Sequence, residues 1–301
     1  AMLPGKAIPA GDCRVEWFGG DVLPIMAALC PESSFANILE PALQGGWVHE
    51  LTGTLTRSGG MIGMVYGPDE VRAGCCAVPD FDLLPDSGKA TFTLPSGDVR
   101  LWVSGCAPGA THAHLDIGQF TLEVGTTPIF IDRGMVQYWL VEAHFLSRSW
   151  LHNVLTPVDE AGNFPSQSLP TTPDKISASD DHLEVVIPGC GVWTTRLEDY
   201  ERRFQVLSPL SFQVVDTFIS AEKGAVVFHL HSPHLFQIEG KHAVLHLDNA
   251  SIEVEFDWAE NVECRQTMID FSHKPVFHIC AVSPILQGDI CLRTHITVLR
   301  P

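Results

Sequence analysis

Residues 111–134 read THAHLDIGQFTLEVGTTPIFIDRG, and this stretch predicts a β-hairpin with polar side chains near its ends. Gly125 begins the expected tight turn between two apolar runs. His112 and His114 precede the first run, and Asp132 follows the second. Buried polar groups must find partners or cost stability, so imidazoles and a carboxylate gathered around one hairpin make this stretch the best candidate for chemistry.

Outward from this hairpin, the chain beyond residue 50 reads as short strands separated by Gly, Pro, Asp and Ser. The expected strands are Val48–Leu55, Met61–Tyr66, Lys89–Leu94, Val99–Val103, Gln137–Glu142, Ala225–His231, His234–Glu239, His242–Leu247, Ser251–Trp258, Pro275–Val282 and Ile290–Leu299. The last six alternate apolar and polar residues and predict an antiparallel meander. The fold class is therefore mainly β, and we expect a large antiparallel β-sandwich of two packed sheets.

The N-terminal segment has a different pattern. Apolar residues between Asp21 and Leu43 recur at helical spacing, interrupted by prolines, which predicts two short helices. We expect an irregular, short-helical segment over residues 1–50 and the sandwich over residues 51–301. Within the sandwich, residues 156–181 form the longest polar, Pro-rich stretch, which is typical of a flap.

The composition excludes several classes of partner. With 36 acidic and 18 basic residues, the formal charge of −18 argues against nucleic acid and against an anionic membrane surface. No apolar run is long enough to span a bilayer. The nine cysteines include no C-x-x-C pair, so neither a zinc ribbon nor a dense disulfide framework is expected. This cysteine usage favours a reducing compartment, such as the cytoplasm, or an exported protein with few disulfide bridges.

The two histidines of the opening stretch are spaced for a shared ligand. An H-x-H pair on extended chain places both side chains on one side, about 6.5–7 Å apart, within reach of one metal ion or one sugar ring. In a simple hairpin, however, Asp132 pairs near Gln119, about 16 Å along a straight strand from His114. A site that includes Asp132 therefore requires the loop carrying His112 and His114 to fold back over the sheet.

Other histidines have plainer interpretations. His152, in Arg148-Ser-Trp-Leu-His-Asn153, is on its own typical of a turn or a capped strand end. His229 and His231 alternate with apolar residues in a regular strand, a pattern that favours a polar sheet face.

Several motifs resemble one family when they are taken in order. The sequence contains LPDSGKATF (84–92), HAHLDIGQF (112–120), PIFIDRG (128–134) and RSWLHN (148–153), followed by YERRF (200–204) and VVDT (214–217). This ordered set resembles the C-terminal β-sandwich of the heparinase II/III-like polysaccharide lyases. The resemblance covers about residues 80 to 220.

The resemblance implies a set of functional residues. His112 is expected to lie in the active cleft and to act on the substrate. His114, Asp132 and His152 are expected to hold a zinc ion that shapes the cleft.

The resemblance also implies a substrate and a missing domain. The substrate would be an acidic, uronate-containing polysaccharide such as heparin or alginate, cleaved by β-elimination, with Arg148 and Asn153 contacting carbohydrate or supporting the site. Lyases of this family take further groups from an N-terminal helical toroid, which two short helices cannot build. We therefore expect this chain to be the β-half of a bacterial lyase and to be catalytically incomplete alone. The resemblance implies a periplasmic location, against the cytoplasmic one that cysteine usage favours.

Two other classes remain open. The first is a non-catalytic carbohydrate-binding or structural β-sandwich, which would bind sugar without cleaving it. The second is a cupin-type metal enzyme, whose motif is G-x(5)-H-x-H followed by Glu. Here Gly105 is one residue too far from His112, and Gly118 and Gln119 occupy the expected Glu positions.

Overall fold

The computed structural model describes residues 80–105, 114–134, 141–168, 174–189, 191–193, 196–269 and 275–300. The expected segment at residues 1–50 and the strands expected at Val48–Leu55 and Met61–Tyr66 lie outside the described residues. Among the residues that are described, no helix is long and apolar enough to cross a membrane.

The first sheet contains the opening hairpin and confirms its strands. Its five antiparallel strands follow chain order: β1 (Phe81–Leu84), β2 (Lys89–Thr93), β3 (Val99–Ser104), β4 (Gln119–Val124) and β5 (Thr127–Phe130). Glycines with positive φ, Gly97 at +83° and Gly125 at +61°, lie in the turns before β3 and β5. Residues with a Cβ rarely adopt this conformation, which is why these turns contain glycine.

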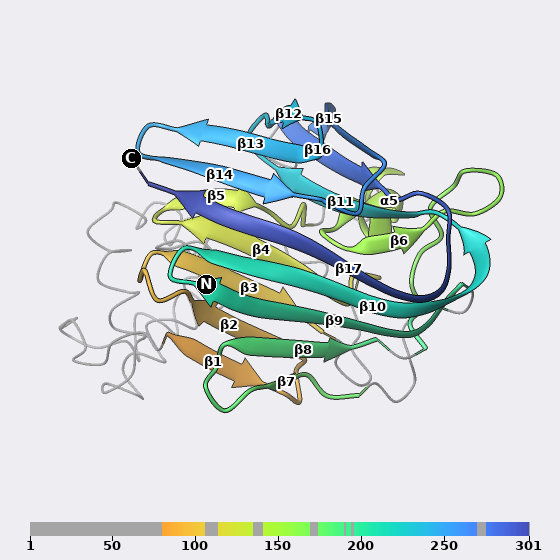
Figure 1. The fold of residues 1–301 in the computed structure, drawn as a ribbon, viewed down its shortest axis with the longest axis horizontal. Coiled ribbons are helices and arrows are strands. Elements are labelled where there is room, and N and C mark those ends of the chain that lie inside the picture. The colour runs from red at the N-terminus through yellow and green to blue at the C-terminus, as the bar shows by residue number, and fades with distance from the viewer. Residues whose placement is uncertain are drawn as a thin grey trace, which may run out of the picture. The chain divides into compact units, whose positions relative to one another are not determined.

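The second sheet is the largest, and Figure 1 shows its long strands running side by side. Its spatial order is β12-β13-β14-β17-β10-β9-β8-β7. The bounds are β7 (Ser177–Ala178), β8 (Glu184–Pro188), β9 (Leu197–Ser208), β10 (Ser211–Gly224), β12 (Gln237–Glu239), β13 (His242–Leu247), β14 (Ala250–Glu255) and β17 (Leu286–Leu299). The hairpin of β9 and β10 and the return of β17 beside β10 form its centre.

The third sheet has four strands in the order β15-β16-β11-β6. The bounds are β6 (Leu155–Pro157), β11 (Val226–Ser232), β15 (Asn261–Ile269) and β16 (Pro275–Val282). The expected single meander is therefore wrong in its connectivity. Strands β11, β15 and β16 belong to this sheet, whereas β12, β13, β14 and β17 belong to the large sheet. Strand β15 was missed, although Glu263 and Arg265 alternate with the apolar Val262 and Cys264 as in a strand.

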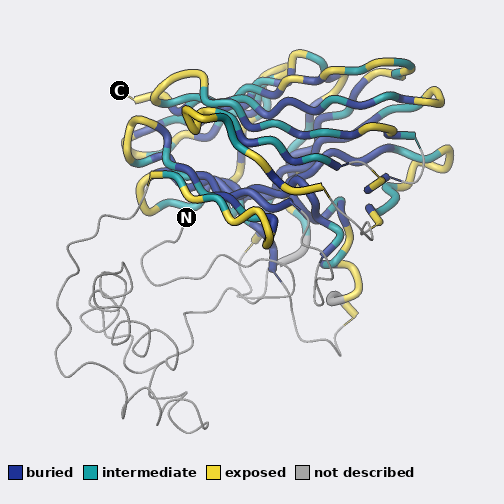
Figure 2. The backbone as a smooth tube through the Cα atoms, turned by 90° about the horizontal axis from the view of Figure 1, so that it is seen from below, coloured by how far each residue is buried: buried dark blue, intermediate teal, exposed yellow. Residues whose placement is uncertain are grey.

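Buried apolar residues from all three sheets form one continuous core, which confirms the antiparallel β-sandwich, with three sheets where two were expected. Phe120 of β4 packs edge to face against Phe204 and Phe212 of the large sheet, at centroid distances of 5.4 and 6.4 Å. The two smaller sheets meet where Ile131 N donates to His231 O at 2.9 Å. Figure 2 shows buried chain along the strands and exposed chain at the turns.

Two local expectations are corrected. Val141 and Glu142 begin a short helix, α5 (Val141–Leu146), where a strand was expected, because the run VEAHFL contains the good helix formers Glu, Ala and Leu. His229 and His231 do lie on a strand, β11, but both are fully buried, so their face is not a solvated polar surface.

Candidate active site

Three side chains far apart in the sequence meet beside the opening hairpin. His114, Asp132 and His152 are 2%, 1% and 0% exposed, and their candidate ligand atoms all lie within 4.8 Å of one another. His114 precedes β4, Asp132 follows β5, and His152 follows the 3₁₀ helix η1 (Ser149–Leu151). The structure therefore brings together the three residues that the resemblance assigns to a metal.

The chain after His114 does not continue the hairpin in a straight line. It forms hydrogen bonds with residues 147–149 and with Gln167. Leu115 N donates to Ser147 O at 3.0 Å, and the Ser149 hydroxyl donates to Leu115 O. The Gln167 side chain donates to Ile117 O at 2.9 Å and accepts from Ile117 N at 2.7 Å. These bonds pair the loop's backbone as a strand would and hold His114 near His152.

The Asp132-x-Gly134 motif has a local structural reason. Gly134 N donates to Asp132 Oδ1 at 2.7 Å, and Gly134 has a positive φ of +64° that favours glycine. This turn uses one carboxylate oxygen. The other, Oδ2, lies 3.4 Å from His152 Nδ1.

His152 is oriented by a backbone carbonyl. Its Nε2 lies 2.9 Å from Leu146 O, and because a carbonyl can only accept, Nε2 carries the proton. Nδ1 is thereby directed toward Asp132, and the His114 ring lies at a centroid distance of 5.0 Å. Two imidazoles and a carboxylate with an outer hydrogen bond to a carbonyl are a donor set typical of zinc.

The pKa values of the buried pair move in opposite directions. Burial acts to raise the pKa of Asp132, but attraction to His152 and His114 and the hydrogen bond from Gly134 N outweigh it, so this pKa is lowered. Burial acts to lower the pKa of His152, but the Asp132 carboxylate outweighs it and raises this pKa. The site therefore favours a carboxylate at Asp132, the form that binds a cation.

Asn153 connects the site to two sheets. It is fully buried, its Nδ2 donates to Phe120 O at 2.7 Å and to Ile131 O at 3.1 Å, and its Oδ1 accepts from His231 N at 2.7 Å. These bonds lie inside the protein and fix the backbone next to His152. Carbohydrate contact by Asn153 stays a prediction.

A buried ion pair that the sequence did not assign to the site supports it from the large sheet. Arg202 is fully buried and forms two hydrogen bonds with Asp216, at 2.7 and 2.9 Å. Its Nη1 donates to the carbonyl oxygens of Gly118 and Asn153, each at 3.0 Å. Tyr200 donates its hydroxyl to Asp216 at 2.7 Å. The motifs YERRF and VVDT carry these residues and were the signal for them.

The remaining predicted site residues are His112 and Arg148. His112 falls outside the described residues. Arg148 is exposed, with its guanidinium 5.5 Å from the centroid of the Phe145 ring, and it has no ion pair with any residue that the structure describes. An exposed guanidinium can pair with an anionic group such as a carboxylate or sulfate.

The chain is similar to known proteins in sequence and in fold. The family described as "Heparinase II/III-like, C-terminal" matches residues 77–273, which is more than half of the chain. None of the curated proteins matches.

Solved structures share the fold. A mutant of the heparan sulfate lyase HepC from Pedobacter heparinus has a TM-score of 0.70 and 14% identity, over 100% of this chain and 45% of its own. A heparinase III with methylated lysines has a TM-score of 0.67 and 12% identity, over 98% of this chain and 43% of its own. Another heparinase III has a TM-score of 0.55 and 14% identity, over 86% and 42%. This chain thus spans less than half the length of each.

Proposed function

This chain belongs to the heparinase II/III-like family through its C-terminal domain, and we propose that it is the β-sandwich part of a lyase for uronate-containing acidic polysaccharides. The observation that carries the proposal is the buried group of His114, Asp132 and His152, which the fold assembles in the region of the family match. The similar solved structures are described as heparan sulfate lyase and heparinase III, which favours a glycosaminoglycan over other uronides.

The reaction is β-elimination. A base removes the acidic proton on the carbon next to the uronate carboxylate, the electron pair forms a carbon–carbon double bond, and the glycosidic oxygen leaves from the adjacent carbon and takes up a proton. His112 is the group we propose as base or as a stabiliser of developing charge, because an imidazole with a reference pKa of about 6.5 exchanges protons near neutral pH.

The buried group would hold a zinc ion. His114, Asp132 and His152 fit this role because their donor atoms converge and the Leu146 carbonyl fixes the tautomer of His152. When bound, the ion supplies a fixed positive charge that shapes the cleft wall. His114 is two residues from His112, so ordering His114 also limits where His112 can lie.

Arg148 is proposed to bind the substrate's anionic groups. Its guanidinium is exposed three residues after Phe145, whose ring supports it. A guanidinium can pair with a carboxylate or sulfate through two parallel hydrogen bonds. Arg148 thereby supplies the local positive charge that a chain of net charge −18 requires to bind an anionic substrate.

We further propose that this chain alone turns over substrate poorly. It spans less than half of each similar solved structure, and the family resemblance places other reacting groups in a helical domain. Alone, it would bind oligosaccharide without efficient cleavage.

The experiment follows the absorbance of the unsaturated uronate product with heparan sulfate, heparin and alginate as substrates. The protein translated from the full natural coding sequence is expected to produce it, and His112→Ala to abolish it while oligosaccharide binding persists. Binding without turnover by that protein on every substrate would contradict the lyase proposal and favour a carbohydrate-binding sandwich. Robust turnover by residues 1–301 alone would contradict the incompleteness.

A further inference from the structure

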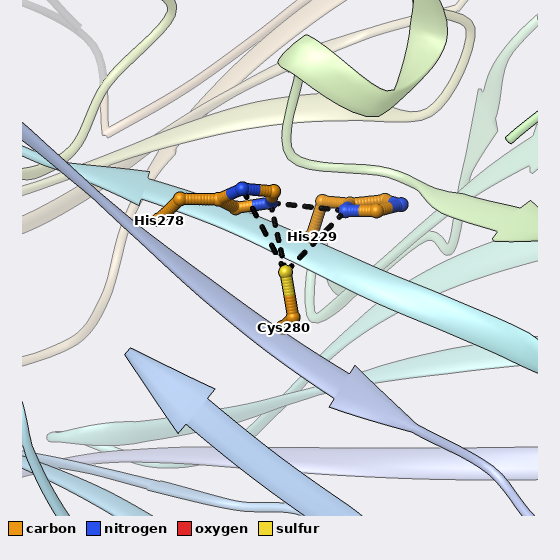
Figure 3. A group of neighbouring side chains, drawn as sticks. All are labelled: His229, His278 and Cys280. Carbon is orange, nitrogen blue, oxygen red and sulfur yellow. Dashed lines mark hydrogen bonds between the residues drawn. The ribbon is translucent and has the colours of Figure 1, made fainter. Parts of the chain in front are cut away.

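A second group of metal-type ligands lies in the four-stranded sheet, apart from the proposed active site. His229 of β11 and His278 and Cys280 of β16 are 0%, 5% and 6% exposed. In the antiparallel register His229 pairs with Cys280, and His278 lies two residues from Cys280 on the same face. Figure 3 shows the three side chains pointing toward one another.

The distances among the donor atoms match one coordination shell. His229 Nδ1 lies 3.0 Å from His278 Nε2, and Cys280 Sγ lies 3.2 Å from His278 Nε2 and 4.0 Å from His229 Nδ1. A tetrahedral zinc site with Zn–N of about 2.0–2.1 Å and Zn–S of about 2.3 Å has edges of about 3.3 Å between nitrogens and about 3.6 Å between nitrogen and sulfur. These separations are close to those of one shell, and because Sγ also lies 3.6 Å from His278 Nδ1, the His278 ring must turn for Nε2 to face the ion.

The surroundings hold His229 in the orientation that a ligand needs. Its Nε2 lies 2.8 Å from the buried Thr156 hydroxyl, which leaves Nδ1 facing His278 and Cys280. An outer hydrogen bond to the second ring nitrogen is the usual arrangement for a metal-bound imidazole. The Phe164 ring packs edge to face on His229 at a centroid distance of 5.1 Å, which further fixes the ring.

Neighbouring side chains fix the position of the His278 ring and determine the electrostatic environment of the three proposed ligands. The buried His231 ring stacks on His278 at a centroid distance of 4.4 Å and an interplanar angle of 15°. Burial raises the pKa of Cys280 to about 12 and lowers that of His278 to about 3, so without an ion both groups are neutral. Two guanidinium groups, the buried Arg133 and Arg265, act against a further positive charge at His278, whereas Arg265 also acts in favour of a thiolate at Cys280.

We propose that His229, His278 and Cys280 bind a thiophilic divalent ion of the zinc class, with the fourth coordination position left to a non-protein ligand. On binding, the Sγ–H bond of Cys280 breaks, its electron pair forms the bond to the ion, and the proton passes to solvent. The thiolate and two imidazoles select against magnesium and calcium, which prefer oxygen ligands. This site is independent of the proposed lyase function.

Cobalt(II) is the probe that separates the two sites. Added under anaerobic conditions to the chelator-treated chain, Co²⁺ is expected to give a near-ultraviolet sulfur-to-cobalt charge-transfer band that saturates within two equivalents, the number of proposed sites, and is removed by Zn²⁺. The His114, Asp132 and His152 group contains no sulfur, so Asp132→Asn should leave the band intact.

The cysteine variants identify the thiolate that gives rise to the charge-transfer band. Cys280→Ser should abolish it, whereas Cys264→Ser should retain it, because Cys264 pairs with Ile279 on the neighbouring strand and packs, partly buried, against the apolar core. A band that is absent from the wild type, or that persists in Cys280→Ser, would overturn the proposal.

The histidine variants are a second route if Cys280→Ser fails to fold by circular dichroism. His278→Gln and His229→Gln should each weaken Co²⁺ binding at least tenfold while circular dichroism of the metal-free protein is unchanged. Unaltered Co²⁺ affinity in both would exclude these ligands.

Discussion

The side-chain oxygen of Asn153 accepts a hydrogen bond from the backbone nitrogen of His231 at 2.7 Å. Asn153 follows His152 of the proposed active site, and His231 stacks on His278 of the second group. One buried amide therefore connects the backbones that carry the two ligand groups. Its removal leaves buried backbone groups in both smaller sheets without their partner.

Asn153→Ala is expected to lower the free energy of unfolding by at least about 3 kcal/mol. The variant loses three hydrogen bonds, worth about 0.5–1.5 kcal/mol each, and leaves buried backbone atoms unsatisfied at about 1–3 kcal/mol each. Urea denaturation measures the change. Asn163→Ala is the control, because the exposed Asn163 side chain bonds only Asp159 among the described residues and should cost about 0.5 kcal/mol. Equal losses would contradict the role of Asn153.

Gly118→Ala should be more destabilising than Gly97→Ala. Both glycines have φ near the same value, +90° and +83°, so the backbone strain is matched at about 1–3 kcal/mol. A Cβ at Gly118 would lie 3.2 Å from Arg202 Cδ, whereas nothing lies within 4 Å of one at Gly97. We expect a further loss of about 1–3 kcal/mol at Gly118, measured by urea denaturation. Identical losses would show that Arg202 adapts freely.

Asp132→Asn is expected to weaken zinc binding at the proposed active site by at least about a hundredfold. Loss of an outer-shell partner alone costs about 10–100-fold, and Asp132 supplies a ligand atom and the charge. Zinc affinity is measured by chelator competition in a Cys280→Ser background, so that only this site is counted. Asp116→Asn, a buried carboxylate two residues from His114 outside the ligand group, should change affinity less than tenfold. Unchanged zinc affinity in Asp132→Asn would show that Asp132 is not a zinc ligand.

Arg148→Ala should weaken binding of heparan sulfate oligosaccharides about tenfold, in accordance with loss of one charge-assisted hydrogen bond. Its stability should change by less than about 0.5 kcal/mol, because Arg148 is exposed. Isothermal titration calorimetry at low salt gives the affinity. Arg265→Ala, on β15, removes an equal charge and should leave affinity unchanged. Equal effects would indicate non-specific attraction to positive charge.

The sequence predicted most strands because strand periodicity is local. The strands expected at Lys89–Leu94, Val99–Val103 and Pro275–Val282 match β2, β3 and β16 within a residue. The assignment of the final strands to two different sheets could not be predicted this way. Alternation of side chains records which face is buried, but not which distant strand lies alongside.

The sequence by itself determined the antiparallel β fold, the turn at Gly125 and, through its ordered motifs, the family to which the chain belongs. The family resemblance predicted that His114, Asp132 and His152 meet, but only the tertiary structure placed their ligand atoms together. It also decided that His229 meets Cys280 from 51 residues away, which no motif predicted. Such contacts depend on strand register and on hydrogen bonds such as that from Arg202 to Gly118, 84 residues apart. Local residue patterns do not encode these distances, because they are set only when the sheets pack.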